Sequence, residues 1–179
     1  MHLNNQIKKT EFIGFIFVCV LGTILHFVYD LTGENYIIGL FVPVNESVWE
    51  HLKLLYLPYC LYSIYEAVKL SNRKFNVYFS KAIGITAGMI TTLSIYYVVL
   101  GVTGKQISAV NIVSFFIGVA IAFIVSYLLL TKSIGRGILN GIGAVYLIIL
   151  GILFMYFTYH PITIPLFLDP QTNTYSVTG

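Results

Sequence analysis

Long apolar runs separated by short polar stretches dominate the chain. A membrane-spanning helix needs about 20 predominantly apolar residues. Five segments meet this requirement, at residues 12–29, 51–70, 78–100, 107–130 and 138–159. Because the connections between them are short, neighbouring spans should be antiparallel and packed together. The pattern predicts an all-α polytopic membrane helix bundle with five transmembrane helices, in a single integral membrane domain covering residues 1–179.

The second apolar segment is the most polar of the five and carries Pro58. Tyrosines recur along it at a spacing of three residues, at Tyr56, Tyr59, Tyr62 and Tyr65. A buried tyrosine hydroxyl needs a hydrogen-bond partner, which lipid does not provide. We therefore expect this helix to lie among the others rather than to face lipid.

Glycines at helical spacing predict where helices approach closely, because small residues let two backbones come together. Gly84 and Gly88 have this spacing in the third segment. The fifth segment and the residue before it carry Gly137, Gly141, Gly143 and Gly151.

Two apolar stretches are unsuited to span a membrane. Residues 35–45 contain Gly39 and Pro43 and are too short, which predicts a re-entrant or interfacial loop buried by protein. Residues 160–170 contain Pro161, Pro165 and Pro170, and such a segment cannot form a regular helix. We expect it to fold back over the outer mouth of the bundle.

Composition agrees with a membrane protein: 58% of the residues are hydrophobic and only 9% are charged. A net charge of +3 without a basic run argues against nucleic acid as a partner. Cys19 and Cys60 lie in apolar runs, so we expect free thiols, with a disulfide between two helices as the alternative.

The distribution of Lys and Arg predicts the orientation, because cytoplasmic loops are enriched in these residues. One set of connections and chain ends holds the basic residues Lys8, Lys9, Lys69, Arg73, Lys74, Lys81, Lys132 and Arg136. Most acidic residues fall on the other side. This predicts a cytoplasmic N-terminus and an extracytoplasmic C-terminus.

The outer side gathers most of the ionisable residues outside the basic connections. His26 and Asp30 have the spacing of one helix face, the stretch 44–53 holds Glu46, Glu50 and His51, and His160 and Asp169 follow the last span. Imidazole and carboxylate are zinc ligands. We therefore predict a divalent metal site, with zinc as the candidate ion, whose ligands are His26, Asp30, His51 and His160. Glu50 or Glu46 would act as general base, and Lys53 or Asn45 would stabilise developing negative charge.

Structural explanations exist for the same residues. Ser47 and Glu50 form an S-x-x-E capping box, and Lys53 could pair with Glu46 or Glu50. Glu66 could pair with Lys69 or Arg73, and Asp169 could cap a turn. A polar substrate or ion pocket without chemistry is a further alternative.

Three stretches together resemble a family of small bacterial integral membrane proteins of unknown function. They are residues 43–53 (PVNESVWEHLK), 26–30 (HFVYD) and 165–170 (PLFLDP). The resemblance covers the whole chain and implies a bacterial plasma membrane, but it implies no activity.

The sequence therefore favours a membrane-embedded hydrolase or transferase acting on a lipid or lipid-linked substrate at an extracytoplasmic site. Membrane lipid is the expected partner. The alternatives are a binding or transport protein for a small cation or polar solute, and a membrane subunit that docks a partner chain.

Overall fold

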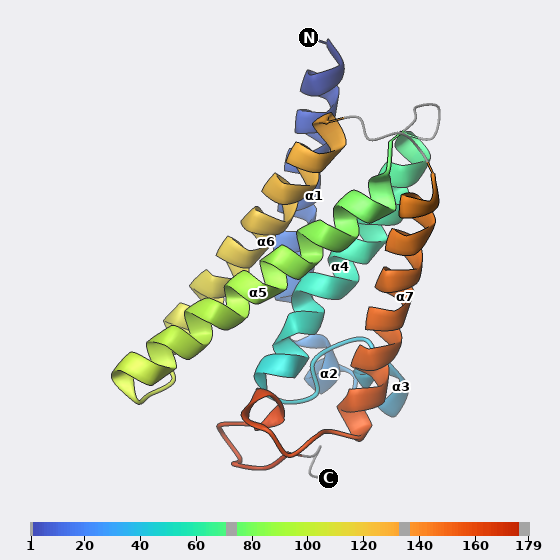
Figure 1. The fold of residues 1–179 in the computed structure, drawn as a ribbon. Coiled ribbons are helices and arrows are strands. Elements are labelled where there is room, and N and C mark those ends of the chain that lie inside the picture. Colours follow the sequence, from blue (N-terminus) through green and yellow to red (C-terminus); the bar gives the residue numbers. More distant parts are fainter. Residues whose placement is uncertain (1, 71–74, 133–136, 176–179) are drawn as a thin grey trace.

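Five long helices form the bundle (Figure 1), in a computed structural model that describes residues 2–70, 75–132 and 137–175. They are α1 (His2–Leu25), α4 (Val48–Lys69), α5 (Val77–Thr103), α6 (Ser108–Thr131) and α7 (Ile138–Tyr159). Two single-turn helices, α2 (Val28–Leu31) and α3 (Tyr36–Gly39), lie between α1 and α4, and a 3-10 turn, η1 (Pro165–Phe167), follows α7. Successive long helices run antiparallel. The all-α architecture is confirmed.

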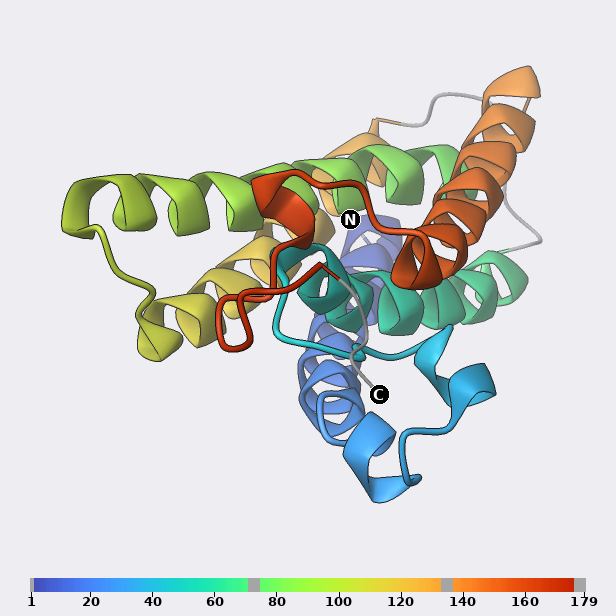
Figure 2. The same ribbon diagram turned by 90° about the horizontal axis from the view of Figure 1, so that it is seen from below.

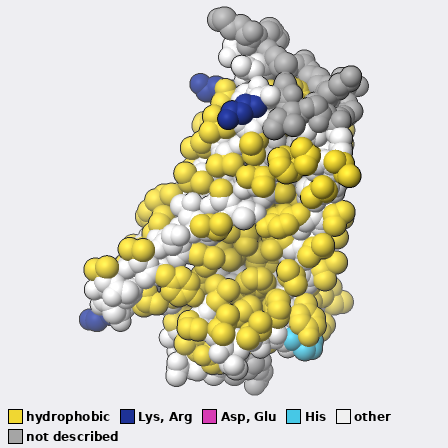
Figure 3. Space-filling model, in the orientation of Figure 1, with side chains coloured by type: hydrophobic (Ala, Val, Ile, Leu, Met, Phe, Trp, Pro, Cys, Tyr) yellow, Lys and Arg dark blue, Asp and Glu magenta, His cyan; other side chains and the backbone are white. Residues whose placement is uncertain are grey.

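Three of the helices, α5, α6 and α7, are long and apolar enough to cross a membrane. The other two predicted spans, α1 and α4, carry ionisable side chains within their length, among them Glu11, Lys53 and Glu66. Hydrophobic side chains cover most of the flank seen in Figure 3, and Lys side chains lie towards its ends. This surface is consistent with a membrane protein.

Helix α4 lies at the centre of the bundle and contacts α1, α5, α6 and α7. Three of its tyrosine hydroxyls donate to backbone carbonyls on three different neighbours. The pairs are Tyr56–Leu147 at 2.6 Å, Tyr59–Ala122 at 3.2 Å and Tyr62–Thr10 at 2.5 Å. The predicted burial of this helix is confirmed, although Tyr65, the fourth tyrosine, is exposed.

The closest helix contact joins α5 and α6, which pack together more extensively than any other pair. A Cβ atom at Gly88 would lie 2.6 Å from the carbonyl oxygen of Gly118, so only glycine fits there. Gly84 has the same role one turn away, against the carbonyl of Ala122. The prediction for Gly141 was wrong, since a Cβ there would meet no atom within 4 Å.

Both irregular segments lie at one end of the bundle (Figure 2), opposite the N-terminal end of α1. The first contains α3, and its carbonyls at Gly39 and Val42 accept hydrogen bonds from the buried Lys53 ammonium. The tail packs Phe167 against Trp49, with ring centroids 5.0 Å apart. The tail therefore folds back on the bundle as predicted, and residues 35–45 form an irregular loop in which Gly39, Val42 and Pro43 are buried.

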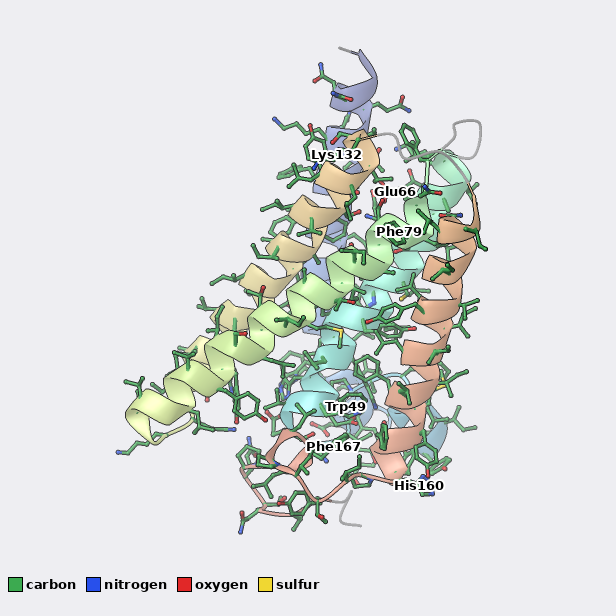
Figure 4. The ribbon with its side chains drawn as sticks, in the orientation of Figure 1. Trp49, Glu66, Phe79, Lys132, His160 and Phe167 are labelled. Atoms are coloured by element: carbon green, nitrogen blue, oxygen red, sulfur yellow. The ribbon has the colours of Figure 1, made fainter. Side chains whose placement is uncertain are left out.

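Glu66 and His160 lie towards opposite ends of the bundle. Figure 4 places Glu66 and Lys132 near one end, and Trp49, Phe167 and His160 near the other. Lys81, counted above among the basic surface residues, is instead fully buried. Arg73, Lys74 and Arg136 lie outside the described residues. Cys19 and Cys60 are free thiols, as predicted.

Replacing Gly88 by alanine should destabilise the protein, because the added methyl group would overlap the Gly118 carbonyl oxygen. Overpacking of this kind lowers the free energy of unfolding by about 1–3 kcal/mol. Gly101→Ala is the control in the same helix, because a Cβ there meets nothing within 4 Å. Thermal unfolding in detergent should show a lower melting temperature for Gly88→Ala and an equal or higher one for Gly101→Ala. Equal destabilisation by the two variants would contradict the contact.

Candidate metal site

Two histidines and one glutamate converge at the end of the bundle that carries the irregular segments. One ligand atom each from His26, Glu46 and His51 can be chosen so that all lie within 4.8 Å of one another. The Glu46 carboxylate lies 3.8 Å from His26 Nε2 and 3.4 Å from His51 Nε2. Two ligands of one tetrahedral zinc ion, each 2.0–2.1 Å from it, are about 3.4 Å apart. The arrangement therefore suits a metal after small side-chain rotations.

Three different elements supply these side chains. His26 follows the last residue of α1, Glu46 lies in the loop before α4, and His51 is in the first turn of α4. Hydrogen bonds order the loop around Glu46. Asn45 Oδ1 accepts from the Ser47 backbone N–H at 3.0 Å, and Ser47 Oγ accepts from the Glu50 N–H at 3.4 Å. Asn45, predicted to stabilise an anion, thus supports the N-terminus of α4.

The two histidine rings lie side by side, with centroids 5.2 Å apart. His51 Nδ1 lies 3.0 Å from the Ser47 carbonyl oxygen, to which it would donate. In that tautomer Nε2 carries no proton, so its lone pair is available to bind a metal ion. Histidine ligands in metal sites are commonly oriented in this way by a backbone carbonyl. His26 Nδ1 is buried and has no hydrogen-bond partner among the described residues.

A cavity of about 430 Å³ opens beside the cluster, between α1, α4 and α6. His26, Glu46 and His51 form part of its wall. Most of the remaining wall is apolar, and polar side chains are interspersed at Gln106, Ser108, Asn111 and Gln171. Sequence reasoning missed these four residues. The available signal was Ser108 and Asn111, two polar residues in the first turn of an otherwise apolar helix.

Two of the four predicted metal ligands are not brought to this cluster. Asp30 is exposed, because α1 ends at Leu25 and the helical spacing from His26 to Asp30 is interrupted. His160 is also exposed, and its ring stacks on Tyr156 with centroids 4.8 Å apart. Glu46, predicted as a general base, instead lies between the two histidines.

Glu50 and Lys53 form a separate buried ion pair, 2.7 Å apart, with exposures of 2% and 1%. Glu50 Oε2 also accepts from the Val44 N–H at 3.1 Å, and the Thr158 hydroxyl donates to Oε1 at 3.1 Å. Lys53 donates to Thr158 and to two loop carbonyls. The capping box is therefore half formed, since Glu50 does not reach back to the Ser47 N–H. The pair fastens the loop carrying Glu46 to α4 and α7.

Removing one member of this pair should be more damaging than removing both. Glu50→Gln leaves the Lys53 ammonium buried without a counter-ion, and breaking a buried pair in this way costs about 3–5 kcal/mol. The double variant Glu50→Gln, Lys53→Met leaves no uncompensated charge and should recover part of this loss. Thermal unfolding of the two single variants and the double variant measures the coupling. A Glu50→Gln protein that melts like the parent would contradict the structural role.

Comparison with known proteins identifies a family but no function. No curated protein and no solved structure matches the chain. A family model described as "Family of unknown function (DUF6512)" matches residues 1–177, which is almost the entire chain. The predicted relationship to a family of unknown function is thus confirmed, and the chain belongs to the DUF6512 family.

Proposed function

We propose that the protein is a metal-dependent membrane hydrolase or transferase whose ion is held by His26, Glu46 and His51. The observation that carries the proposal is the convergence of these three side chains, from three elements, on one point of a cavity wall. Catalytic zinc sites have three protein ligands and a fourth coordination position that is open to water or substrate, whereas structural zinc sites have four protein ligands. Three ligands beside a cavity therefore match the catalytic type. A bound divalent ion would supply Lewis-acid polarisation of a carbonyl or phosphoryl oxygen.

The cavity wall favours an amphipathic substrate. Phe27, Phe115 and Phe116 give it an apolar side suited to acyl or prenyl chains. Asn111 and Gln171 can hydrogen-bond to a polar headgroup. A lipid or lipid-linked molecule combines both parts, and its ester or phosphoester bonds are suited to metal-assisted cleavage or transfer.

The proposal includes five membrane crossings, by α1 and α4 in addition to the three apolar helices. Support comes from four ionisable residues within α1 and α4 that are buried against protein rather than exposed on the flank: Glu11, Glu50, Lys53 and Glu66. The N-terminal end, with Lys8, Lys9 and Lys132, would be cytoplasmic, and the metal site would face the outside of a bacterial plasma membrane.

Purified protein should bind one Zn²⁺ per chain, measured by calorimetry and by metal analysis. His26→Ala and His51→Ala each remove a ligand, so the affinity should fall by more than the roughly 10–100-fold typical of a lost second-shell partner. His160→Ala is the matched control and should bind Zn²⁺ like the parent, because His160 lies outside the cluster. Equal losses in all three variants, or no binding by the parent, would refute the site.

Catalysis requires a separate test. The protein is reconstituted into vesicles of phosphatidylglycerol and phosphatidylethanolamine with Zn²⁺, and the lipids are analysed by mass spectrometry. Cleaved or exchanged headgroups in the parent, absent from His51→Ala, would support enzymatic function. Stoichiometric Zn²⁺ binding without lipid conversion, in these vesicles or in native lipid extracts, would favour the alternative of a cation-binding or transport protein.

Whether α1 crosses the membrane is tested with cysteines at two exposed positions, one near the start of α1 and one in the segment after α2, in a background with Cys19→Ala and Cys60→Ala. Asn5→Cys and Glu34→Cys should react with membrane-impermeant maleimide from opposite sides, because α1 would cross the membrane. Glu34→Cys should be labelled in intact cells and Asn5→Cys only after lysis. Labelling of both from one side would leave α1 outside the crossing helices.

A further inference from the structure

A second ion cluster lies inside the half of the bundle remote from the metal site. The Lys81 ammonium of α5 lies 2.8 Å from a carboxylate oxygen of Glu11 in α1 and 2.6 Å from one of Glu66 in α4. Lys81 and Glu66 are fully buried, and Glu11 is 4% exposed. The Ser126 hydroxyl of α6 donates to the other Glu11 oxygen at 2.7 Å. Four helices thus meet at two carboxyl groups and one ammonium.

Among the residues that the structure describes, the surroundings of Lys81 supply no second cation. The rings of Tyr59, Tyr62 and Phe123 face Lys81, at 5.1, 5.9 and 4.6 Å from the ammonium to the ring centroids. The hydroxyls of Tyr59 and Tyr62 donate to backbone carbonyls. Among the described residues, Glu66 Oε1 has no hydrogen-bond partner. No other charged group of the described α1, α4, α5, α6 and α7 pairs with the cluster.

The net charge of the cluster indicates how many protons it binds. Two ionised carboxylates and one ammonium would leave a net charge of −1 away from water. Burying an uncompensated charge costs on the order of several kcal/mol of desolvation free energy, even after the protein relaxes around it. Burying a neutral carboxylic acid costs much less. One additional positive charge makes the cluster neutral.

The cluster also has access to the outside of the bundle. Glu11 borders a groove of about 640 Å³ between α1 and α6, which is lined mainly by apolar side chains. Lys8 and Lys9 border the same groove, one helical turn or less from Glu11. Exchange with the N-terminal end of the bundle could therefore occur along α1 without unfolding it.

We propose that Glu11 and Glu66 together bind one exchangeable proton within the bundle, beside Lys81. The proton resides on one or the other of the two carboxyl groups and makes the cluster of two carboxyl groups and one ammonium neutral. This site does not depend on the proposed metal site, which lies at the other end of α4. The ligand is a proton rather than an alkali ion, because the ammonium already occupies the position between the two carboxyl groups.

The test is infrared spectroscopy of the full chain in lipid nanodiscs at neutral pH. The parent should show the C=O band of one protonated carboxylic acid, shifted by D₂O and by ¹³C labelling of glutamate. Glu11→Gln and Glu66→Gln should each abolish the band, because one carboxylate and Lys81 then balance. Lys81→Met should double it, since both carboxyl groups must then be neutral. Glu34→Gln, at an exposed position, is the control and should leave the band unchanged.

Several results would overturn the proposal. One is the absence of the band in the labelled parent, a measurement that needs no variant to fold. Another is a band that survives in both Glu11→Gln and Glu66→Gln, which would place the proton elsewhere. A band that appears in the parent only after removal of Na⁺ and K⁺ would identify the site as one for an alkali ion.

Discussion

A buried polar group on the central helix is costly unless it has a partner inside the otherwise apolar bundle, and this constraint organises the structure. Lipid and apolar side chains cannot satisfy a hydroxyl, an ammonium or a carboxylate. Helix α4 meets the requirement by directing Tyr56, Tyr59 and Tyr62 to carbonyls on three neighbours. Its ionic residues pair near its two ends, with Lys53 at one and Glu66 at the other. The positions of α1, α6 and α7 around α4 follow from these contacts.

The candidate metal site depends on the same helix, although α4 contributes only His51 to it directly. The loop carrying Glu46 is held by the Glu50–Lys53 pair, which is completely enclosed. The ionisable residues of the stretch 44–53 therefore fall into two sets in different environments. Glu46 and His51 face a cavity, whereas Glu50 and Lys53 face the interior. Within α4, Glu50 and Lys53 are three residues apart on one helix face and His51 lies on another, whereas Glu46 is placed by the loop before the helix.

The length of the apolar runs predicted the five long helices, and short length together with Gly and Pro residues predicted the two irregular segments. Both patterns depend only on neighbouring residues, so they can be recognised in the sequence. The tyrosine spacing also foretold the burial of α4. The pairing of Lys53 with Glu50 was one of two alternatives that the sequence indicated, but the partner of Glu66 was not predicted. Glu66 pairs with Lys81 rather than Lys69, since the packing of α4 against α5 decides which cation is near. Arg73, the other predicted partner, lies outside the described residues. Likewise, grouping His26 with His51 was foreseen, but the turn after Leu25 that separates Asp30 from His26 carries no Gly or Pro signal. Ser108 and Asn111 stand out in the sequence as polar residues in the first turn of an apolar helix, but only the tertiary structure places them on the cavity wall.

The contacts of the Lys53 ammonium set an order for assembly. Its acceptors come from the last residue of α3 and the loop after it, from α4 itself and from Thr158 near the end of α7. Thr158 is 105 residues further along the chain, so the ammonium cannot be fully coordinated until the last helix has joined the others. The wall of the cavity that carries Glu46 therefore takes its final form late in biogenesis. A chain stalled before α7 would hold an incompletely partnered cation, a feature that membrane quality control could detect.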